Sequence, residues 1–470
     1  MASTFHSATS FPGNDASGNQ GSEHEGPDSH QETMTLTVNP TIDQAGTVSP
    51  KLLKKVISAA AVGNFIEWYD FAVYGYLATI LAAKFFPGSN PTTALLETFA
   101  VFAVAFALRP IGGGFFGRLG DKIGRKRTLV LTILLISGST AFIGILPDYA
   151  TWGIWAPIIL VIARCLQGFS AGGEYAGACA YVIEHAPTEK KNTYASFVPV
   201  STFLSFAFAA GFTYILAQAV GPDSMNDWGW RVPFLLAIPL GLFGFYLRSK
   251  LGETPLFQNM EEEKEVEAAP LRETIRTHWR TILTLAGFIS ATALSFYTFT
   301  TYMATFMQVV GKLSRPESLL SSCLCLVFAG LLCPFMGRLS DRIGRRNTTR
   351  SACIVLIITV FPAFMLAGTG NLGLSVLGQF LLGIGAVMTG IVTAVLMSEL
   401  FPTKVRYTAS AATYNLAYTV FGGTAPFIAT WLIASTGNNL SPAIYLVAVC
   451  IMAFIACSKL PETSKKSLDF

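Results

Sequence analysis

Long apolar segments separated by short polar stretches make up the chain from Lys51 onward. About 20 apolar residues suffice to cross a bilayer as a helix, and twelve segments meet that length. The predicted spans are 52–83, 95–116, 128–146, 155–184, 194–220 and 231–250 in the first half, and 281–308, 318–337, 349–368, 372–400, 409–435 and 442–460 in the second. The pattern predicts an all-α polytopic membrane protein with twelve transmembrane helices.

A short basic motif occurs twice in equivalent places. It reads GRLGDKIGRKR at Gly117–Arg127 and GRLSDRIGRRN at Gly337–Asn347, with seven of eleven residues shared. Glycine permits a sharp turn, aspartate can cap the next helix or pair with arginine, and basic side chains stay out of hydrocarbon. Each copy is therefore predicted to form a cytoplasmic turn. The repeat indicates two pseudo-symmetric bundles of six helices each.

Composition and charge placement fit this topology. The chain is 52% hydrophobic and 13% charged, whereas soluble domains carry roughly a quarter charged residues. All but six of the 32 Lys and Arg residues fall in segments predicted to be cytoplasmic. The six exceptions are Lys84, Arg109, Arg164, Arg231, Lys312 and Arg315. By the positive-inside rule both termini are predicted to be cytoplasmic, and basic residues that follow topology argue against nucleic-acid binding.

The apolar pattern also sets the domain boundaries. Residues 1–50 are rich in small and polar residues and predict a disordered cytoplasmic tail. Residues 51–250 form the first predicted bundle, and residues 281–460 the second. The stretch 251–280 contains an acidic run and predicts a cytoplasmic linker, and 461–470 predicts a short cytoplasmic tail.

A second repeat concerns glutamates at helix ends. Glu184 precedes His-Ala-Pro-Thr and Glu399 precedes Leu-Phe-Pro-Thr, and a basic loop follows each. Proline ends the helix, and the glutamate can pair with basic residues of the repeated motif. We expect charge clusters that close the cytoplasmic face in one state, although the same residues could serve only topology and static packing. The expected members are Asp121, Arg125, Glu184, Asp341, Arg345, Glu399 and Arg406.

The first predicted helix carries ionisable residues near its middle, in GNFIEWYDFAVYGY. Asn64, Glu67, Asp70, Phe71 and Tyr74 follow helical spacing and predict one polar and aromatic stripe facing the protein interior. A charge at the bilayer centre is costly, and two carboxyls one turn apart repel when both are ionised. We expect at least one of them to exchange a proton near neutral pH, unless an arginine from another helix neutralises it permanently.

The fourth predicted helix carries Arg164, Gln167 and Glu174 among glycines four residues apart. Small residues at that spacing allow helices to pack closely, but packing does not explain the three polar residues. The second half of the chain has aromatic residues instead of charges inside its helices. They lie on the seventh and eleventh predicted helices of the chain. Aromatic faces attract ammonium groups by roughly 0.5–2 kcal/mol each, so carboxylates on one half and aromatics on the other suit a small zwitterion.

Two functional sets follow from these patterns. The proton-coupling candidates are Glu67, Asp70 and Glu174. The substrate-binding candidates are Asn64, Trp68, Phe71, Tyr74, Arg164, Tyr175, Tyr297, Tyr302, Tyr414, Asn415 and Tyr418. The eight cysteines lie in apolar segments without metal-ligand spacing, and the sequence has no nucleotide loop and no nucleophile beside a histidine. We therefore expect no metal, no cofactor and no enzymatic activity.

The two motif copies resemble the conserved loop that follows the second and eighth helices of the major facilitator superfamily. Four further segments resemble its metabolite:proton symporter family, and most of all the proline/glycine betaine transporters. These segments are GNFIEWYDFAVYG at Gly63–Gly75, QGFSAGGEYAGA at Gln167–Ala178, DWGWRVPF at Asp227–Phe234 and ETPLFQ at Glu253–Gln258. The resemblance extends from about Lys51 to Glu462.

This resemblance implies uptake of zwitterionic compatible solutes, such as proline, glycine betaine or ectoine, together with a proton by alternating access. It also implies a bacterial inner membrane and a functional monomer. Some members end in a cytoplasmic coiled coil, whereas this sequence stops at Phe470, so we expect osmotic regulation by that device to be absent. The alternative cargo is an organic acid such as citrate, 2-oxoglutarate or shikimate. A polyanion requires several inward basic groups, and only Arg109 and Arg164 lie inside predicted helices, which favours the zwitterion.

Overall fold

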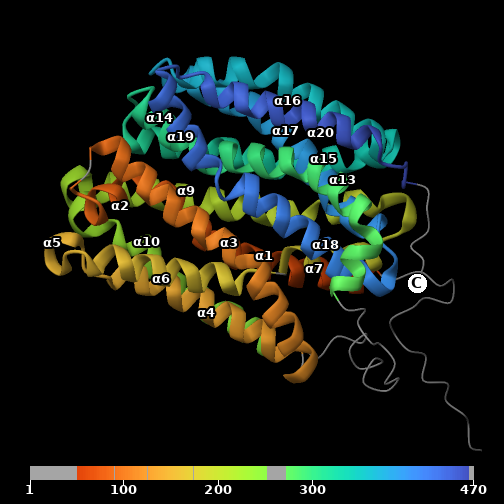
Figure 1. Cartoon of the computed structure of the whole chain (residues 1–470). Helices are drawn as coiled ribbons and strands as arrows, with labels where there is room; N and C mark the ends of the chain where they lie inside the picture. The colour runs from red at the N-terminus through yellow and green to blue at the C-terminus, as the bar shows by residue number, and fades with distance from the viewer. Residues whose placement is uncertain (1–49, 89, 124, 173, 251–270, 465–470) are drawn as a thin grey trace, which may run out of the picture. The chain divides into compact units, whose positions relative to one another are not determined.

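The computed structural model describes residues 50–88, 90–123, 125–172, 174–250 and 271–464, and every regular element in these ranges is helical (Figure 1). The N-terminal bundle contains α1 (Pro50–Tyr76), α2 (Ala78–Phe85), α3 (Pro91–Ile123), α4 (Arg125–Ile145), α5 (Tyr149–Trp152), α6 (Trp155–Ser170), α7 (Glu174–Glu184), η1 (Thr188–Lys190), α8 (Lys191–Ala195), α9 (Phe197–Ser224), η2 (Met225–Gly229), α10 (Arg231–Leu235) and α11 (Ala237–Lys250). The C-terminal bundle contains α13 (Leu271–Tyr297), η3 (Thr298–Tyr302), α14 (Met303–Val309), α15 (Arg315–Ile343), α16 (Arg345–Ala367), α17 (Leu372–Glu399), α18 (Thr403–Ala417), η4 (Tyr418–Gly422), α19 (Ala425–Thr436) and α20 (Ser441–Ser458).

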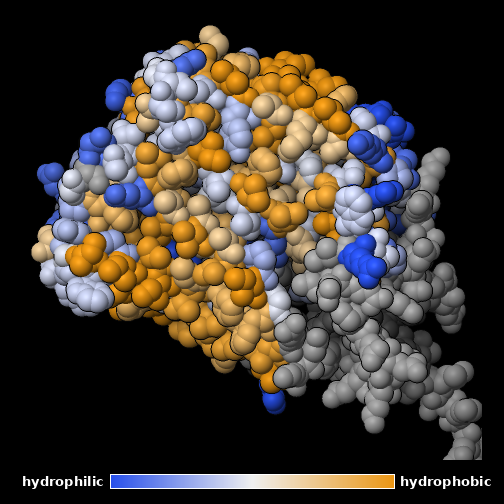
Figure 2. Space-filling model, in the orientation of Figure 1, coloured by the Kyte–Doolittle hydropathy of each residue, from blue (hydrophilic) through white to orange (hydrophobic). Residues whose placement is uncertain are grey.

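The twelve predicted spans are all present as helices. Within the described ranges, nine helices are long and apolar enough to cross a membrane, and Val130–Ile145 and Arg231–Leu247 are shorter apolar helices. Helix α1 supplies the remaining span. Figure 2 shows hydrophobic side chains over the middle of the visible face and hydrophilic ones toward its two ends. The fold is therefore the predicted all-α membrane fold of two six-helix bundles.

Several boundaries differ from the prediction. The predicted tail 1–50, except for Pro50, lies outside the described residues, as do 251–270 of the predicted linker and 465–470 of the C-terminal tail. Helix α13 begins at Leu271, ten residues before the predicted span, so the last part of the predicted linker is helical. Arg276 and Arg280 are exposed there, which shows that the helix continues past its apolar segment with charged residues on its outer side.

Several predicted spans are interrupted, among them the fourth, the seventh and the eleventh. The fourth breaks between Ser170, the end of α6, and Glu174, the start of α7. A Cβ at Gly172 would overlap backbone atoms of Arg109 and Gly113 in α3, so only glycine permits this close approach. The seventh and eleventh spans contain the π-helical turns η3 and η4, and such turns are frequent at functional sites.

The repeated motif forms a tighter connection than the predicted turn. In the second copy α15 continues to Ile343, Gly344 alone breaks the helix with φ 89°, and α16 begins at Arg345. In the first copy α3 ends at Ile123 and α4 begins at Arg125. Most of the described residues of each motif are therefore helical. In the second copy Gly344 reverses the chain in one residue, because glycine can adopt a positive φ without a steric penalty.

Helices of the two bundles pack against each other directly. The strongest of these contacts joins α9 to α15, and α7 also meets α17 and α18. Figure 1 shows α16 and α20 on the outer side of the C-terminal bundle, and α4 and α6 on that of the N-terminal bundle. We call the end that carries the two motif copies the motif end, and the end that carries α5 the opposite end.

Candidate functional site: a closed central cavity

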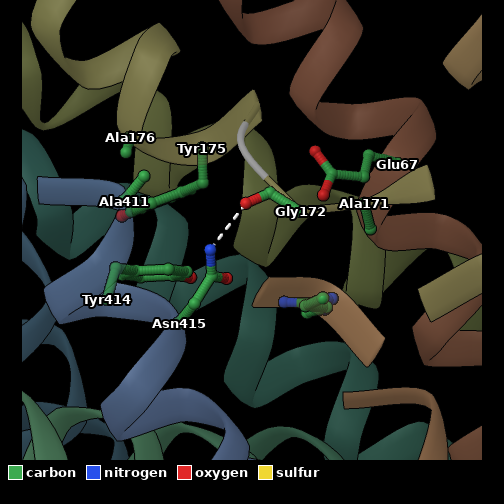
Figure 3. Close-up of a pocket in the computed structure, with 9 residues that line it drawn as sticks. Glu67, Ala171, Gly172, Tyr175, Ala176, Ala411, Tyr414 and Asn415 are labelled. Carbon is green, nitrogen blue, oxygen red and sulfur yellow. Dashed lines mark hydrogen bonds between the residues drawn. The ribbon is translucent and has the colours of Figure 1, made fainter. Parts of the chain in front are cut away.

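A small cavity lies between the two bundles. Its lining residues come from α1, α3, the α6–α7 break, α7 and α18. They are Glu67, Arg109, Ala171, Gly172, Tyr175, Ala176, Ala411, Tyr414 and Asn415. Figure 3 shows Glu67 on one side of the cavity, and Tyr175 and Tyr414 on the other. The free volume of about 10 Å³ is close to the minimum for one water molecule, so the cavity is too small for a solute in this conformation.

Contacts between the bundles close the cavity at its centre. The Nδ2 of Asn415 donates a hydrogen bond to the carbonyl oxygen of Gly172 at 2.6 Å (Figure 3). The Thr419 hydroxyl donates to the carbonyl oxygen of Phe106 at 2.9 Å. The rings of Tyr175 and Tyr414 stack across the same boundary, with centroids 5.0 Å apart and planes at 19°.

The two ends are also bridged. At the motif end Arg406 donates from Nη1 to Oε1 of Glu184 at 3.1 Å. At the opposite end Arg315 donates from Nη1 to Oδ1 of Asn226 at 3.0 Å. A conformation bridged at both ends around a water-sized cavity is an occluded one.

Four charged side chains from the N-terminal bundle are buried around the cavity. The relative exposures of Glu67, Asp70, Arg109 and Arg164 are all 2% or less. Helix α1 supplies both carboxylates, whereas the arginines come from α3 and α6. A Cβ at Gly168 would overlap the Ala105 carbonyl, so the glycine lets α3 and α6 touch and places both arginines beside α1.

Asp70 and Arg164 form the inner pair, away from the cavity lining. They interact electrostatically, and the Thr140 hydroxyl lies within hydrogen-bonding reach of the Asp70 carboxylate, whose Oδ2 has no partner. Arg164 donates from Nη1 to Oε1 of Gln167 at 2.6 Å. Its guanidinium lies 4.1 Å from the Tyr74 ring centroid. A buried carboxylate with one free oxygen beside a buried arginine can gain a proton without leaving its site.

Arg109 is held differently. Its guanidinium carbon lies 4.3 Å from the ring centroid of Phe71 and 4.2 Å from that of Phe106. Its Nε and Nη2 are buried without a hydrogen-bond partner, although it lines the cavity with Glu67. Buried arginine N–H groups are normally satisfied, so this edge of the guanidinium is available to a ligand.

The predicted aromatic residues gather around these charges. Trp68 contacts Tyr175 with centroids 5.9 Å apart and Tyr297 at 6.3 Å. Tyr418 stacks on Tyr414 at 3.9 Å. The hydroxyls of Tyr297 and Tyr414 are buried without a partner. Side chains predicted from both halves of the chain therefore meet in one aromatic wall.

Other predicted substrate residues already have partners. Asn64 donates from Nδ2 to the Thr202 hydroxyl at 2.7 Å and the Ser201 hydroxyl at 2.9 Å, and its Oδ1 accepts from Trp68 Nε1 at 2.9 Å. The Tyr74 hydroxyl donates to the Thr98 carbonyl at 2.9 Å. Tyr302 is not among the cavity-lining residues and contacts Phe99 and Phe306 instead.

The predicted charge cluster of the C-terminal bundle is assembled at the motif end. Arg345 donates from Nη1 to Oδ1 of Asp341 at 2.9 Å and from Nη2 to Oε1 of Glu399 at 3.1 Å. Asp341 does not cap the following helix, but instead accepts from the backbone N–H groups of Asn192 at 3.1 Å and Thr193 at 2.9 Å. This aspartate thus joins the two bundles. The side chains of Asp121, Arg125 and Glu174 lie outside the described residues.

A C-terminal segment that the sequence did not single out completes this cluster. The Glu462 carboxylate accepts from the backbone N–H groups of Arg345 at 2.8 Å and Arg346 at 3.0 Å, and so caps α16. The Thr463 hydroxyl donates to Oε2 of Glu399 at 2.5 Å. Arg109, Thr140 and this segment are the contributors that sequence reasoning left unassigned. Only Arg109 carried a signal, as an arginine inside an apolar segment.

The described residues contain no group of three or more His, Cys, Asp or Glu that could hold a metal ion. Their cysteines are free and buried or half-buried. The polar and aromatic residues that line the cavity are Glu67, Arg109, Tyr175, Tyr414 and Asn415.

Comparisons with known proteins agree with this architecture. Residues 60–426 match the family described as the Major Facilitator Superfamily. The proline/betaine transporter of Escherichia coli (strain K12) is 39% identical over 88% of this chain and 85% of its own length. The glycine betaine/proline/ectoine/pipecolic acid transporter OusA of Dickeya dadantii is 37% identical over 91% and 87%. The ectoine/proline transporter ProP of Corynebacterium glutamicum is 36% identical over 91% and 88%.

Among solved structures, the proton:xylose symporter XylE bound to 6-bromo-6-deoxy-D-glucose has a TM-score of 0.71 at 20% identity, covering 89% of this chain and 98% of that one. The inward-open conformation of the xylose transporter XylE from E. coli has a TM-score of 0.65, also at 20% identity, covering 89% and 98%. These likenesses establish the fold.

Proposed function

The chain belongs to the major facilitator superfamily, and we propose that it imports a small zwitterionic solute of the proline, glycine betaine and ectoine class together with a proton. The observation that carries this proposal is the charge balance around the central cavity. The described charged side chains there are two carboxylates, Glu67 and Asp70, and two guanidinium groups, Arg109 and Arg164. A balanced site beside an aromatic wall fits a solute without net charge. The names of the similar transporters support the same class.

Asp70 is the proposed proton carrier. It belongs to the Asp70–Arg164 pair, which lies behind the cavity lining. Its carboxylate interacts with Arg164 when ionised, and its free Oδ2 accepts the proton. Protonation removes the negative charge and loosens Arg164, which can then shift its contacts with Tyr74 and Gln167. Such a change in a buried pair is a local event that can bias the packing of whole helices. Glu67 and Glu174 remain candidates for the same role.

The proposed orientation in the membrane follows from the charge placement. The motif end, with its concentration of Lys and Arg, is proposed to face the cytoplasm, and both termini are proposed to lie there. The protein is proposed to act as a monomer in the lipid bilayer of a bacterial inner membrane. Breaking the Glu184–Arg406 and Asp341 contacts between the bundles would open the motif end, and breaking the Arg315–Asn226 contact would open the opposite end. Alternating these two openings moves solute and proton inward.

An organic acid is the second candidate cargo. The observation in its favour is that Arg109 and Arg164 both keep buried N–H groups without partners, and arginine binds carboxylates well. Against it stand the two neighbouring carboxylates, which would repel a polyanion in this low-dielectric setting. Competition experiments separate the two cargoes.

The test is uptake of radiolabelled glycine betaine and proline by proteoliposomes, with and without an imposed inward proton gradient. We expect accumulation that requires the gradient and collapses with an uncoupler. Vesicles that accumulate citrate, 2-oxoglutarate or shikimate but neither zwitterion would replace the proposed cargo by the organic acid.

The proton carrier is tested with Asp70→Asn in the same vesicles. We expect loss of net accumulation, because the amide cannot gain a proton, while exchange of external for internal solute persists. Exchange has no net proton movement, so it shows that the variant still binds and translocates. Accumulation that still depends on the proton gradient in Asp70→Asn would move the role to another carboxyl.

A further inference from the structure

We infer that Arg109 binds the carboxylate of the transported solute and so sets the preference for zwitterions over cations that lack a carboxylate. The inference rests on the proposed function and names a residue that the sequence did not assign to the site. Its basis is the position of the guanidinium, the groups that cover it and the groups that it leaves free.

The faces and one edge of Arg109 have distinct environments. Phe71 and Phe106 lie 4.3 and 4.2 Å from the guanidinium carbon, and Trp68 lies at 5.7 Å. The aromatic rings therefore fix the orientation of the guanidinium plane. The Nε and Nη2 atoms, which form one edge of that plane, are buried and have no hydrogen-bond partner. This edge carries two nearly parallel N–H groups, the arrangement that binds a carboxylate through both of its oxygens.

Arg164 is the natural comparison because it is equally buried and also has free Nε and Nη2 groups. It differs in position and in partners. Arg164 is not among the cavity-lining residues, it donates to Gln167, and it interacts electrostatically with Asp70. Arg109 lines the cavity itself. Only Arg109 of these two is placed to meet a solute.

Two aromatic residues of the same cavity lining are suited to the ammonium group of the solute. Tyr175 belongs to the N-terminal bundle and Tyr414 to the C-terminal bundle, and their rings stack face to face at 5.0 Å. When the bundles separate, both faces become free, and a quaternary or secondary ammonium can lie between them. Glu67 lies across the cavity from this pair (Figure 3) and adds a negative charge. In the occluded form each of these two tyrosine rings covers the face of the other ring that would contact the ammonium group.

The resulting site recognises both ends of a zwitterion. A cation such as choline keeps the ammonium contacts but gives Arg109 no carboxylate, so burying the guanidinium edge remains unfavourable. Glycine betaine satisfies both. The discrimination between these two solutes, which share the trimethylammonium group, therefore reports on Arg109.

The experiment uses the full-length protein in proteoliposomes. It measures the KM for glycine betaine uptake and the inhibition constants of choline and of prolinamide, for wild type, Arg109→Gln and Arg109→Lys. For Arg109→Gln we expect at least about a tenfold rise in the KM for betaine, with inhibition by choline and prolinamide unchanged or strengthened, because the unpaired guanidinium edge is removed. Arg109→Lys keeps the charge but not the two-pronged geometry, so we expect an intermediate KM. Arg276→Gln, at an exposed position, is the matched control and should equal wild type.

The outcomes separate the inference from the proposed function. Arg109 variants that prefer betaine over choline as strongly as wild type would overturn the inference while leaving the transport proposal intact. A wild-type protein that carries neither betaine nor proline would overturn the proposed function itself. If Arg109→Gln does not fold, Arg109→Lys decides, because an unchanged betaine KM in that charge-preserving variant contradicts two-pronged binding.

Discussion

At the scale of single residues, Glu462 is a carboxylate with a clear pH signature. It lies outside the membrane-spanning helices. Partial burial acts to raise its pKa, but hydrogen bonds from the backbone N–H groups of Arg345, Ser464 and Arg346 outweigh burial, so the pKa lies below its ordinary value of 4.5. A carboxyl with a lowered folded-state pKa stabilises the fold above its unfolded pKa and loses that contribution as the pH falls through the folded value.

We therefore expect Glu462→Gln to lower the melting temperature at neutral pH and to matter less in acid. The measurement is thermal unfolding of both proteins in detergent between about pH 7 and pH 3. The gap between the two curves should shrink toward the acid end of that range. A gap that stays constant across it would show that ionisation of Glu462 contributes nothing.

The sequence could identify unusual residues but not their partners. Asn64, Glu67 and Asp70 stand out because a polar group in an apolar helix needs a reason. Asn64 proved to bond Ser201 and Thr202 of α9 and to orient Trp68, and those partners depend on which helix faces α1. That information is long-range, so spacing along one helix could not supply it.

At the scale of elements, the contact between α3 and α6 depends on glycine. A Cβ at Gly168 would overlap the Ala105 carbonyl, and one at Gly112 would overlap the Phe169 carbonyl. Backbone cannot give way as a flexible side chain can. These two helices carry Arg109 and Arg164, so their separation would displace both cations from α1.

We expect Gly168→Ala to destabilise the protein by roughly 1–3 kcal/mol or more and to abolish uptake. The matched control is Gly114→Ala in α3, where an added Cβ meets nothing within 4 Å and helix propensity favours alanine. Thermal unfolding and the folded yield on size-exclusion chromatography measure the effect. Equal behaviour of the two variants would show that the α3–α6 contact tolerates a methyl group.

Elements were largely predictable because hydrophobic length decides them. Their interruptions were not. The α6–α7 break at Gly172 and the π-helical turns η3 and η4 follow from packing against other helices. Likewise the motif was predicted as a turn, but Gly344 reverses the chain alone and the flanking residues remain helical.

At the scale of the whole molecule, the repeat predicted two similar bundles, but the functional groups are distributed unequally between them. The buried charges around the cavity belong to the N-terminal bundle, whereas Asp341, Arg345 and Glu399 form the described charge cluster of the C-terminal bundle. A sequence repeat predicts that the two halves share a backbone fold. It does not predict which conformation of the transporter predominates. The occluded arrangement became evident only from the contacts that cross between the bundles.

The Glu184–Arg406 ion pair tests the role of these crossing contacts. We expect Arg406→Glu to slow uptake several-fold, because Arg406 is buried and a reversed charge there would face Glu184. The double variant Glu184→Arg/Arg406→Glu should recover part of the rate. Lys84→Gln removes the Lys84–Asp148 ion pair, which lies within the N-terminal bundle at 3.7 Å, and keeps the Asp148 cap of α5, so it should leave uptake near wild type. If the uptake rate of the double variant is no higher than that of Arg406→Glu, the ion pair between the two bundles does not govern opening.

The bonds made by Glu462 and Thr463 also provide a place to observe motion. Both side chains are tied to α16 and α17 of the same bundle, so a spin label or fluorophore at Ser464 would move with that bundle as a fixed marker. A second label on Lys190, exposed at the motif end of the other bundle, would allow the distance between the two bundles to be measured. The number of distance populations between the two labels would then give the number of conformations, and their widths would give the spread within each. Both would be measured in the presence and absence of solute.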